Sequence, residues 1–561
     1  MTVMNGTGSL PGAHALDNAR PLKVIVIGAG ISGILNGIKL PRAVQNLDLV
    51  IYDKNEGLGG TWLENRYPGV ACDIPSHAYQ LSWDFNHAWS TFYASGSEIL
   101  RYWQRVAEKY NVLKYMRFSH KVLKASWDDA TAKWRVIVQD TDNGGQKTDE
   151  ADVLISAVGI LNQWDWPSIP GLQDFKGKLM HSAAWDPNFQ IEDKVVAVIG
   201  AGSSGIQIVP NIRPKVRQLH HYVRGRTWIA TPMGLDQIIK RGVEGENFDY
   251  EADEIKGWQD NRESYLDYRK AIEKSVQSGS QVVLRGSEVQ AMARQIFSDL
   301  MAKRLSKKPE LLQHFLPSFS PLCKRITPGP GYLEALTEDN VEVIVDPIER
   351  VNETGIVTKC GKQRDVDAII CATGFNTHFD SLPIYGRTGA QLFAENAAGP
   401  RTANYLGLAV NDFANMFMLL GPNSGLGHGN LLITIERFVD YTAQALQKMQ
   451  LENIRTMQPS VRSVKNFTAF CDTYFQRTVY SEECSSWYKT DGRITGLWPG
   501  SSLHAVKALE KPRWEDWEYT YHDDDEMGWL GDGSARADWD ADADKGYYLT
   551  SLEGITDDRL M

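Results

Sequence analysis

The fold is decided by Lys23-Val-Ile-Val-Ile-Gly28-Ala-Gly30-Ile-Ser-Gly33, which joins a buried apolar strand to a glycine-rich turn. A helical stretch follows to about Leu40, and a second apolar strand, Leu47 to Tyr52, ends at Asp53. The three glycines permit a tight turn, close approach of the backbone to a pyrophosphate, and close packing of helix on strand. G-x-G-x-x-G alone is weak evidence. Here a strand precedes it, a helix follows it and an acid lies 25 residues after Gly28, which together predict a dinucleotide-binding βαβ unit.

The same pattern occurs a second time. Lys194-Val-Val-Ala-Val-Ile leads into Gly200-Ala-Gly202-Ser203-Ser204-Gly205, and the next strand, Leu219 to Val223, ends in Arg224-Gly225-Arg226 instead of an acid. A carboxylate at this place accepts the ribose hydroxyls of an adenosine, whereas an arginine pairs with a 2′-phosphate. The first unit is therefore expected to bind FAD or NAD and the second NADPH. The alternative is that Arg224 and Arg226 form a solvated surface pair.

Two further segments share one design. Asp152-Val-Leu-Ile-Ser-Ala-Val-Gly159 and Asp367-Ala-Ile-Ile-Cys-Ala-Thr-Gly374 each place an aspartate before an apolar strand that ends in small residues and a glycine. Each follows one dinucleotide unit, which indicates a two-dinucleotide flavoprotein oxidoreductase. The predicted fold class is α/β, with two Rossmann-like dinucleotide-binding domains, for FAD and NADP, and a helical insertion.

The FAD-binding domain is expected to be discontinuous, because the second unit lies between its parts. Residues 235–322 lack the strand pattern and are predicted to be helical, for example at Ser264 to Val276 and Glu288 to Lys303. The predicted parts are an FAD-binding domain at 20–150 and 386–513, an NADP-binding domain at 151–234 and 323–385, a helical insertion at 235–322, and an acidic aromatic arm at 514–561.

The 561 residues carry a net charge of −11, and this charge is concentrated at the C-terminal end. Residues 514–561 contain 15 acidic and three basic residues, so the rest of the chain is close to neutral. This balance gives no basic footprint for nucleic acid or an anionic membrane. No run approaches the ~18 apolar residues of a spanning helix, and residues 1–20 lack a signal-peptide core. A cytoplasmic location is expected.

The acidic arm also contains eight aromatic residues, more than plain solvated disorder has. It is therefore expected to pack over the protein surface or over a partner subunit. The aromatic residues are Trp514, Trp517, Tyr519, Tyr521, Trp529, Trp539, Tyr547 and Tyr548.

The cysteines predict neither a metal site nor a redox motif. None has C-x-x-C or histidine-paired spacing, and disulfides are not expected in a reducing cytosol. Only Cys72 lies in the segment after the first unit, which disfavours a disulfide reductase. The six cysteines are Cys72, Cys323, Cys360, Cys371, Cys471 and Cys484.

The segment between the two glycine motifs carries a family fingerprint. Phe175-Lys-Gly177-Lys-Leu-Met-His181-Ser-Ala-Ala-Trp185-Asp186 matches F-x-G-x-x-x-H-x-x-x-W-[PD] at every defined position. It resembles the fingerprint of type I Baeyer–Villiger monooxygenases, whereas flavin-containing and N-hydroxylating relatives typically lack the Trp-Pro/Asp ending. Gly59-Gly60-Thr61-Trp62 and Tyr67-Pro68-Gly69 to Asp73 resemble the segment that lies along FAD in that family. The resemblance extends over roughly Leu22 to Leu509.

The resemblance implies roles for single residues. Arg325 takes the place of the family's arginine and would stabilise the transition state, because arginine stays charged and offers a rigid fork of donors. Asp73 is its expected partner, which orients Arg325 and tunes proton uptake by the peroxide. By residue pattern alone, Lys324 and Arg325 would be a surface pair and Asp73 a turn cap. His181 and Trp185 would couple domain movements instead of transferring protons.

The expected cofactor contacts combine the glycine motifs with residues carried over from the family. Lys324 and Arg224 would share the 2′-phosphate of NADPH, and Trp487 would pack on the NADP side. The full expected set is Gly28, Gly30, Gly33, Asp53, Gly60, Thr61, Trp62, Asp73, Tyr79, Val122, Gly200, Gly202, Ser203, Ser204, Gly205, Arg224, Gly225, Lys324, Arg325 and Trp487.

The reaction that the resemblance implies inserts one atom of O₂ beside a ketone carbonyl through a C4a-peroxyflavin, giving an ester or lactone at the expense of NADPH. A flavin monooxygenase that oxidises nitrogen or sulfur, and a catalytically silent FAD- and NADPH-binding protein, are the alternatives. The expected partner is a small-molecule ketone, not a nucleic acid or a membrane. The sequence does not select the ketone, and a homo-oligomer is left open.

Overall fold

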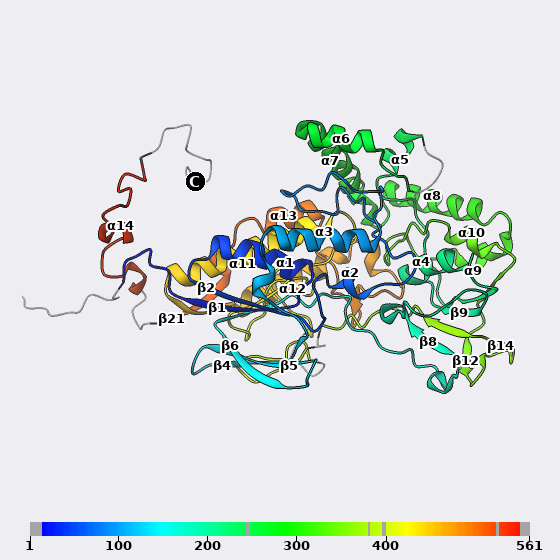
Figure 1. Ribbon diagram of the computed structural model, residues 1–561, viewed down its shortest axis with the longest axis horizontal. Helices are drawn as coiled ribbons and strands as arrows, with labels where there is room; N and C mark the ends of the chain where they lie inside the picture. The colour runs from blue at the N-terminus through cyan, green and yellow to red at the C-terminus, as the bar shows by residue number, and fades with distance from the viewer. Residues whose placement is uncertain (1–13, 243–246, 380–381, 395–399, 523–526, 550–561) are drawn as a thin grey trace, which may run out of the picture.

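Two five-stranded parallel sheets form the centre of the computed structural model, which describes residues 14–242, 247–379, 382–394, 400–522 and 527–549 (Figure 1). The first sheet has the order β17-β7-β1-β2-β3, and all its neighbouring strands are parallel. Its strands come from distant parts of the chain: β1 (Leu22–Ile27), β2 (Leu47–Tyr52), β3 (Met116–Arg117), β7 (Val153–Ser156) and β17 (Met416–Met418).

The second sheet repeats this arrangement with the order β11-β10-β9-β15-β8. Its strands are β8 (Lys178–His181), β9 (Val195–Ile199), β10 (Gln218–Tyr222), β11 (Val341–Ile344) and β15 (Ala368–Cys371). In both sheets a central strand leads into a glycine motif and then a helix, α1 (Ile31–Ala43) or α4 (Ser203–Ile212). The predicted α/β class with two Rossmann-like units is confirmed.

One hydrogen bond recurs in both sheets and explains the aspartate before β7 and before β15. Asp152 Oδ2 accepts from the backbone N–H of Lys23 at 2.8 Å, and Asp367 Oδ2 accepts from that of Val195 at 2.7 Å. Each carboxylate ties the start of its own strand to the start of the parallel neighbour. This contact aligns the ends of the strands that carry the glycine turns.

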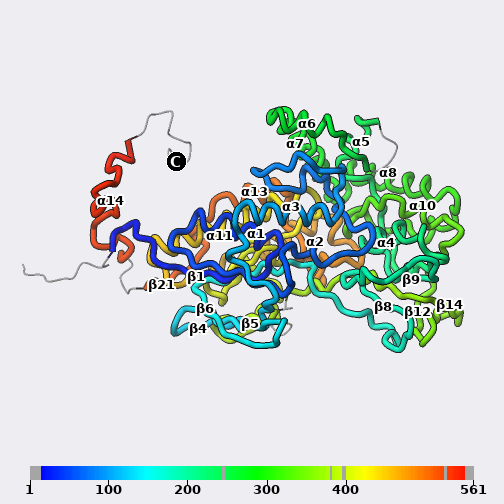
Figure 2. Tube along the Cα trace, in the orientation of Figure 1, coloured from blue at the N-terminus to red at the C-terminus, as the bar shows by residue number. Residues whose placement is uncertain are grey.

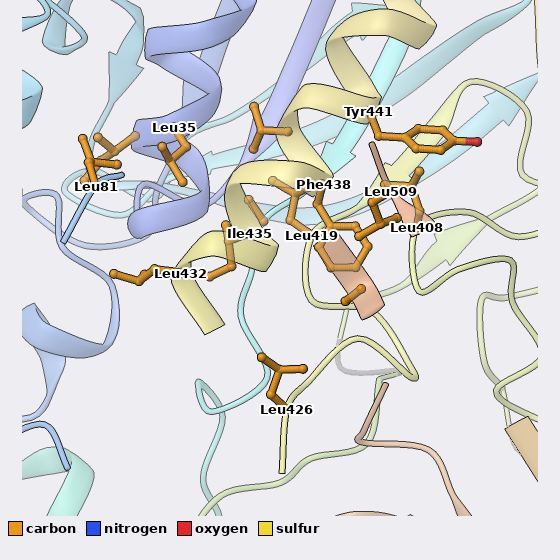
Figure 3. Packing of buried hydrophobic residues seen from close by; sticks show 14 of the residues in the cluster. Leu35, Leu81, Leu408, Leu419, Leu426, Leu432, Ile435, Phe438, Tyr441 and Leu509 are labelled. Carbon is orange, nitrogen blue, oxygen red and sulfur yellow. The ribbon is translucent and has the colours of Figure 1, made fainter. Parts of the chain in front are cut away.

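The largest core lies between the first sheet and the helices that cover it. Helix α11 (Leu431–Leu451) packs against α1, and α3 (Gly96–Lys109) lies beside them (Figure 1). Figure 3 shows Ile435 and Phe438 of α11 among buried residues of other elements, including Leu35 of α1. This long helix from the second half of the chain therefore completes the fold that begins at residue 22.

Two smaller sheets flank the parallel ones: the first is mixed and the second is antiparallel. The first covers the other face of the β1 sheet, where Val136 and Val138 pack with Ile25. It has the order β16-β4-β5-β6, with β4 (His120–Asp128), β5 (Lys133–Asp140), β6 (Gln146–Ala151) and β16 (Ile384–Tyr385), and it is mixed because β16 pairs with β4 in parallel. The second contains β12 (Ile348–Val351), β13 (Gly355–Thr358) and β14 (Gln363–Asp365).

The region 235–322 is helical in its described part, and it lies above the second sheet in Figure 1. The predicted helices are confirmed as α7 (Arg262–Gln277) and α8 (Glu288–Arg304). Four aromatic rings of this region surround His77 of the first fold, with ring centroids 4.8 to 5.4 Å away. The other helices here are α5 (Leu235–Arg241), α6 (Ala252–Asp260) and α9 (Leu312–Phe315).

The acidic arm divides into two parts. Strand β21 (Trp517–Tyr521) pairs with β18 (Ile454–Pro459), and the Trp517 side chain is buried in the core. Farther along, α14 (Arg536–Trp539) lies apart from the body (Figures 1 and 2). Just before it, the backbone carbonyl of Ser534 accepts a hydrogen bond from the backbone N–H of Leu16. Residues 523–526 and 550–561 of the predicted arm lie outside the described residues.

Six further helices and strands belong to the fold. They are α2 (Thr61–Glu64), α10 (Tyr332–Leu336), α12 (Val461–Phe475), β19 (Lys489–Thr490), β20 (Arg493–Ile494) and α13 (Ser502–Ala508). In the part of the chain that the structure describes, no helix combines the length and the apolar character needed to cross a membrane.

Candidate active site

The first glycine turn leaves room for backbone and ligand but none for side chains. Gly28 has φ +111°, and a Cβ there would lie 2.5 Å from the carbonyl oxygen of Ala157 after β7. A Cβ on Gly33 would lie 2.0 Å from the oxygen of Gly28. The helix N-cap is Gly30, which has no side chain, so the N–H groups of the first turn of α1 stay available to an anion. These residues fit a dinucleotide pyrophosphate.

The second glycine turn has the same geometry. Gly200 has φ +112°, and its Cβ would lie 2.4 Å from the carbonyl oxygen of Ala372 after β15. A Cβ on Gly205 would lie 2.1 Å from the oxygen of Gly200, whereas one on Gly202 would meet no atom of the described residues within 4 Å. The turn therefore packs tightly on the protein at Gly200 and Gly205 and leaves space at Gly202, in front of α4. This space fits a second dinucleotide.

Asp53 lies where β2 ends, beside the first glycine turn. Its Oδ2 accepts from the backbone N–H of Ala29 at 2.6 Å and its Oδ1 from that of Asn55 at 2.8 Å. Burial raises the pKa of this carboxyl. The backbone oxygen of Asp53 accepts from His120, which places the predicted adenine-side residue Val122 close by on β4.

The strand end of the second fold is basic and accessible. Arg224, Gly225 and Arg226 are all exposed, and Arg226 donates to the carbonyl of Leu316 at 3.3 Å. Lys324 is half-buried, and burial lowers the pKa of its ammonium group. The two basic segments run side by side, since Ile229 and Thr327 form a parallel bridge just beyond them.

The predicted flavin-side segment packs against the first glycine turn. A Cβ on Gly60 would lie 3.0 Å from Cα of Gly30. Two residues later, Trp62 Nε1 donates to Tyr79 Oη at 3.3 Å, and the two rings are perpendicular with centroids 5.6 Å apart. Thr61 is exposed at the start of α2. The structure therefore brings this predicted set together.

Contacts that sequence reasoning missed join this segment to α4 of the second fold. Tyr67 Oη donates to Gln207 Oε1 at 2.8 Å, and Gln207 Nε2 donates to the carbonyl of Ala71 at 3.0 Å. Gly69 approaches Asn211 so closely that a Cβ would lie 2.1 Å from its Nδ2. The loop that leads to Asp73 thus lies directly on the helix of the second glycine motif.

Arg325 and Asp73 meet at this junction. Arg325 Nη2 donates to both carboxylate oxygens of Asp73, at 2.6 and 2.7 Å, and the side chains are 27% and 23% exposed. The neighbouring carboxylate raises the pKa of the guanidinium, which therefore remains charged. Thr327, two residues on, is hydrogen-bonded to Ser203 at 3.1 Å, so the pair lies between the two folds.

Two tyrosines that the sequence did not single out line the same site. Tyr488 is fully buried, and burial raises its pKa to about 12, while the charge of Arg325 opposes this shift. Its ring contacts Trp487 at 4.6 Å and Tyr480 at 5.7 Å between centroids. The only hint of Tyr488 in the sequence was its position directly after the predicted Trp487.

A disulfide links two of the site's segments, contrary to the expectation of free thiols. Cys323 and Cys484 are bonded, with their Cα atoms 6.3 Å apart. The prediction rested on an expected reducing cytosol and was wrong; the partners are 161 residues apart, so no local spacing reveals the pair either. The bond joins the segment of Lys324 and Arg325 to the segment of Trp487.

The fingerprint histidine is buried and neutral. His181 stacks on Trp164 at 4.4 Å between centroids, and its Nδ1 accepts from the backbone N–H of Ala183 at 3.1 Å. Burial lowers its pKa to about 4. These contacts give it a packing role in the linker that also holds the half-buried Trp185. Its exclusion from proton transfer stays a prediction.

Comparison with known proteins places this geometry among flavoenzymes. The flavin-binding monooxygenase-like family matches residues 21–237. An FAD-binding monooxygenase of Aspergillus terreus, tazF, is 38% identical over 538 residues, covering 94% of this chain and 95% of the relative. A Baeyer–Villiger monooxygenase of Pseudomonas aeruginosa is 33% identical, covering 86% and 88%. Cyclohexanone monooxygenase from Rhodococcus sp. Phi1 bound to NADP⁺ superposes with TM-score 0.77 at 25% identity, covering 90% of this chain and all of that structure.

Proposed function

The chain belongs to the family of flavin-binding monooxygenases, and from this premise we propose that it is a Baeyer–Villiger monooxygenase. It is a flavin-dependent monooxygenase that uses FAD and NADP. In the proposed reaction it inserts one oxygen atom of O₂ next to a ketone carbonyl, giving an ester or lactone and consuming NADPH.

The observation that carries the proposal is the position of Arg325. Its guanidinium is held by Asp73 through two hydrogen bonds at the junction of the two folds. FAD would be held by the first glycine turn, Asp53 and the segment from Gly60 to Tyr79, and NADPH by the second glycine turn, Arg224 and Lys324. When bound, FAD supplies the activation of O₂ and NADPH supplies the electrons.

The chain's own residues account for the step at the ketone. When an oxygen nucleophile adds to the carbonyl, negative charge develops on the ketone oxygen, and a fixed cation stabilises it most where water is scarce. Arg325 carries five N–H donors, and Asp73 binds only those of Nη2. Asp73 fixes the plane of the guanidinium. The buried rings of Tyr480 and Tyr488 exclude water from one side of it. Asp73 is therefore a positioning residue and Arg325 the proposed catalytic residue.

Replacement of Arg325 tests the assignment. Removing one charge-stabilising donor typically costs about 10²–10³ in kcat, so Arg325→Ala is expected to lose ester formation while NADPH still reduces the flavin. Arg462→Gln, at an exposed site on α12, serves as the matched control. Retained ketone oxygenation by Arg325→Ala would refute the proposal. Oxidation of sulfides or amines by a wild-type enzyme that forms no ester would favour the nitrogen- or sulfur-oxidising alternative.

A further inference from the structure

A cavity of about 520 Å³ lies between the helical insertion and the last third of the chain. Its walls come from the end of α7 and the turn after it, from α12, from the loop at Gly427, and from the loop leading into α13. This volume is within the range of sites that enclose drug-sized ligands. The cavity is therefore larger than a single small ring requires.

The inner end of the cavity lies near the proposed catalytic residue. Tyr480 and Gly427 line it, and both are buried. A Cβ on Gly427 would lie 1.9 Å from Tyr480 Oη, so this wall is tightly packed. The ring of Tyr480 contacts that of Tyr488, which is adjacent to Arg325. Burial and the charge of Arg325 both lower the pKa of His428, another residue of the lining, so this end of the cavity lies close to the guanidinium.

The lining is aromatic and carries positive charge without any negative charge. Phe470, Tyr474, Tyr480 and Trp498 supply flat apolar surface. The ionisable basic groups are His428, His504 and Arg477, and none of the lining residues that the structure describes is an aspartate or glutamate. Burial lowers the pKa of both histidines, so Arg477 is the fixed cation of the lining near neutral pH.

The backbone of Arg477 is fixed by hydrogen bonds, and its guanidinium is not neutralised. Its backbone N–H donates to the carbonyl of Tyr474 at 3.2 Å, and its own carbonyl accepts from the backbone of Arg285 at 2.9 Å. The guanidinium carbon lies 5.7 Å from the centre of the Tyr474 ring. Within the described ranges, no carboxylate forms an ion pair with it, and the residue is exposed at the outer end of the lining.

We propose that this cavity selects aryl ketones that carry an anionic substituent, such as a carboxylate, and that Arg477 is the residue that recognises the anion. The aromatic walls stack on the aryl group, and Arg477 pairs with the carboxylate through its planar fork. The ketone carbonyl then points to the inner end, toward Arg325. This inference rests on the proposed function, because it names the substrate class of the same reaction.

The test compares two substrates that differ only in charge: 6-acetyl-2-naphthoate and its neutral carboxamide. The ratio of their kcat/KM values is measured by ester formation with the purified, FAD-loaded enzyme. The wild type is expected to prefer the carboxylate by tenfold or more, and Arg477→Gln to bring the ratio close to one, mainly through KM. Arg477→Lys should keep part of the preference, and Arg462→Gln all of it. Calorimetric binding of the carboxylate should weaken in parallel in Arg477→Gln.

The outcomes distinguish a wrong role for Arg477 from a wrong proposed function. If neutral ketones yield esters but the wild type shows no preference for the carboxylate, or Arg477→Gln keeps that preference, the inference about Arg477 is wrong and the proposed function stands. If no ketone in a panel of linear, cyclic and aryl compounds yields an ester, the proposed function itself fails.

Discussion

Removing the bond between Cys323 and Cys484 is expected to destabilise the protein substantially. The two residues are 161 positions apart, and the chain-entropy relation for a loop of this length gives about 17 cal/mol/K, or about 5 kcal/mol at 25 °C. Measured effects of disulfides commonly fall below this limit. Replacing both cysteines by serine should therefore lower the free energy of unfolding by about 2 to 5 kcal/mol.

Two assays check this expectation. Thiol titration of the urea-unfolded protein without reductant should detect four free thiols, because Cys72, Cys360, Cys371 and Cys471 are not bonded, and six after reduction. Urea unfolding should show a lower midpoint for the double serine variant than for the wild type. Cys360→Ser, at an exposed free cysteine, is the matched control and should leave the midpoint unchanged.

The bond also has a kinetic consequence. It anchors the segment of Lys324 and Arg325, so its loss should raise the KM for NADPH as that segment gains freedom. Six titratable thiols in protein that was never reduced would refute the bond. An unchanged unfolding midpoint in the double variant would refute the stability reasoning.

Three further predictions concern the cofactor sites and the C-terminal arm. Gly33→Ala places a Cβ 2.0 Å from a backbone oxygen and should yield protein without flavin absorbance, whereas Gly257→Ala, where a Cβ meets no described atom within 4 Å, should keep its flavin. Arg224→Gln should raise the KM for NADPH about tenfold with little change for NADH, and an equal loss for both would contradict a 2′-phosphate contact. Truncation after Pro512, which removes β21 and the buried Trp517, should lower the melting temperature, whereas truncation after His522 should largely preserve it; equal melting temperatures would contradict a structural role for β21.

The elements predicted from sequence are those whose signals are local. The strand from Leu47 to Tyr52 and two helices of the insertion, α7 and α8, were found within a few residues, because each follows from the periodicity of neighbouring side chains. The pairing of Arg325 with Asp73 came from family resemblance alone, since these residues are 252 positions apart. The disulfide and the cavity wall at Arg477 escaped prediction for the same reason, because contacts between distant segments leave no periodic trace.

The interleaving of the two parallel sheets sets an order for synthesis on the ribosome. All strands of the second sheet have been made once Cys371 is translated, whereas the first sheet receives β17 only at Met416–Met418. At 5–20 residues per second, this delay is about 2 to 9 s. During that time the edge of β7 has no partner strand, and unpaired strand edges promote aggregation. A nascent chain of this protein is therefore most vulnerable after its second parallel sheet has closed and before its first is complete.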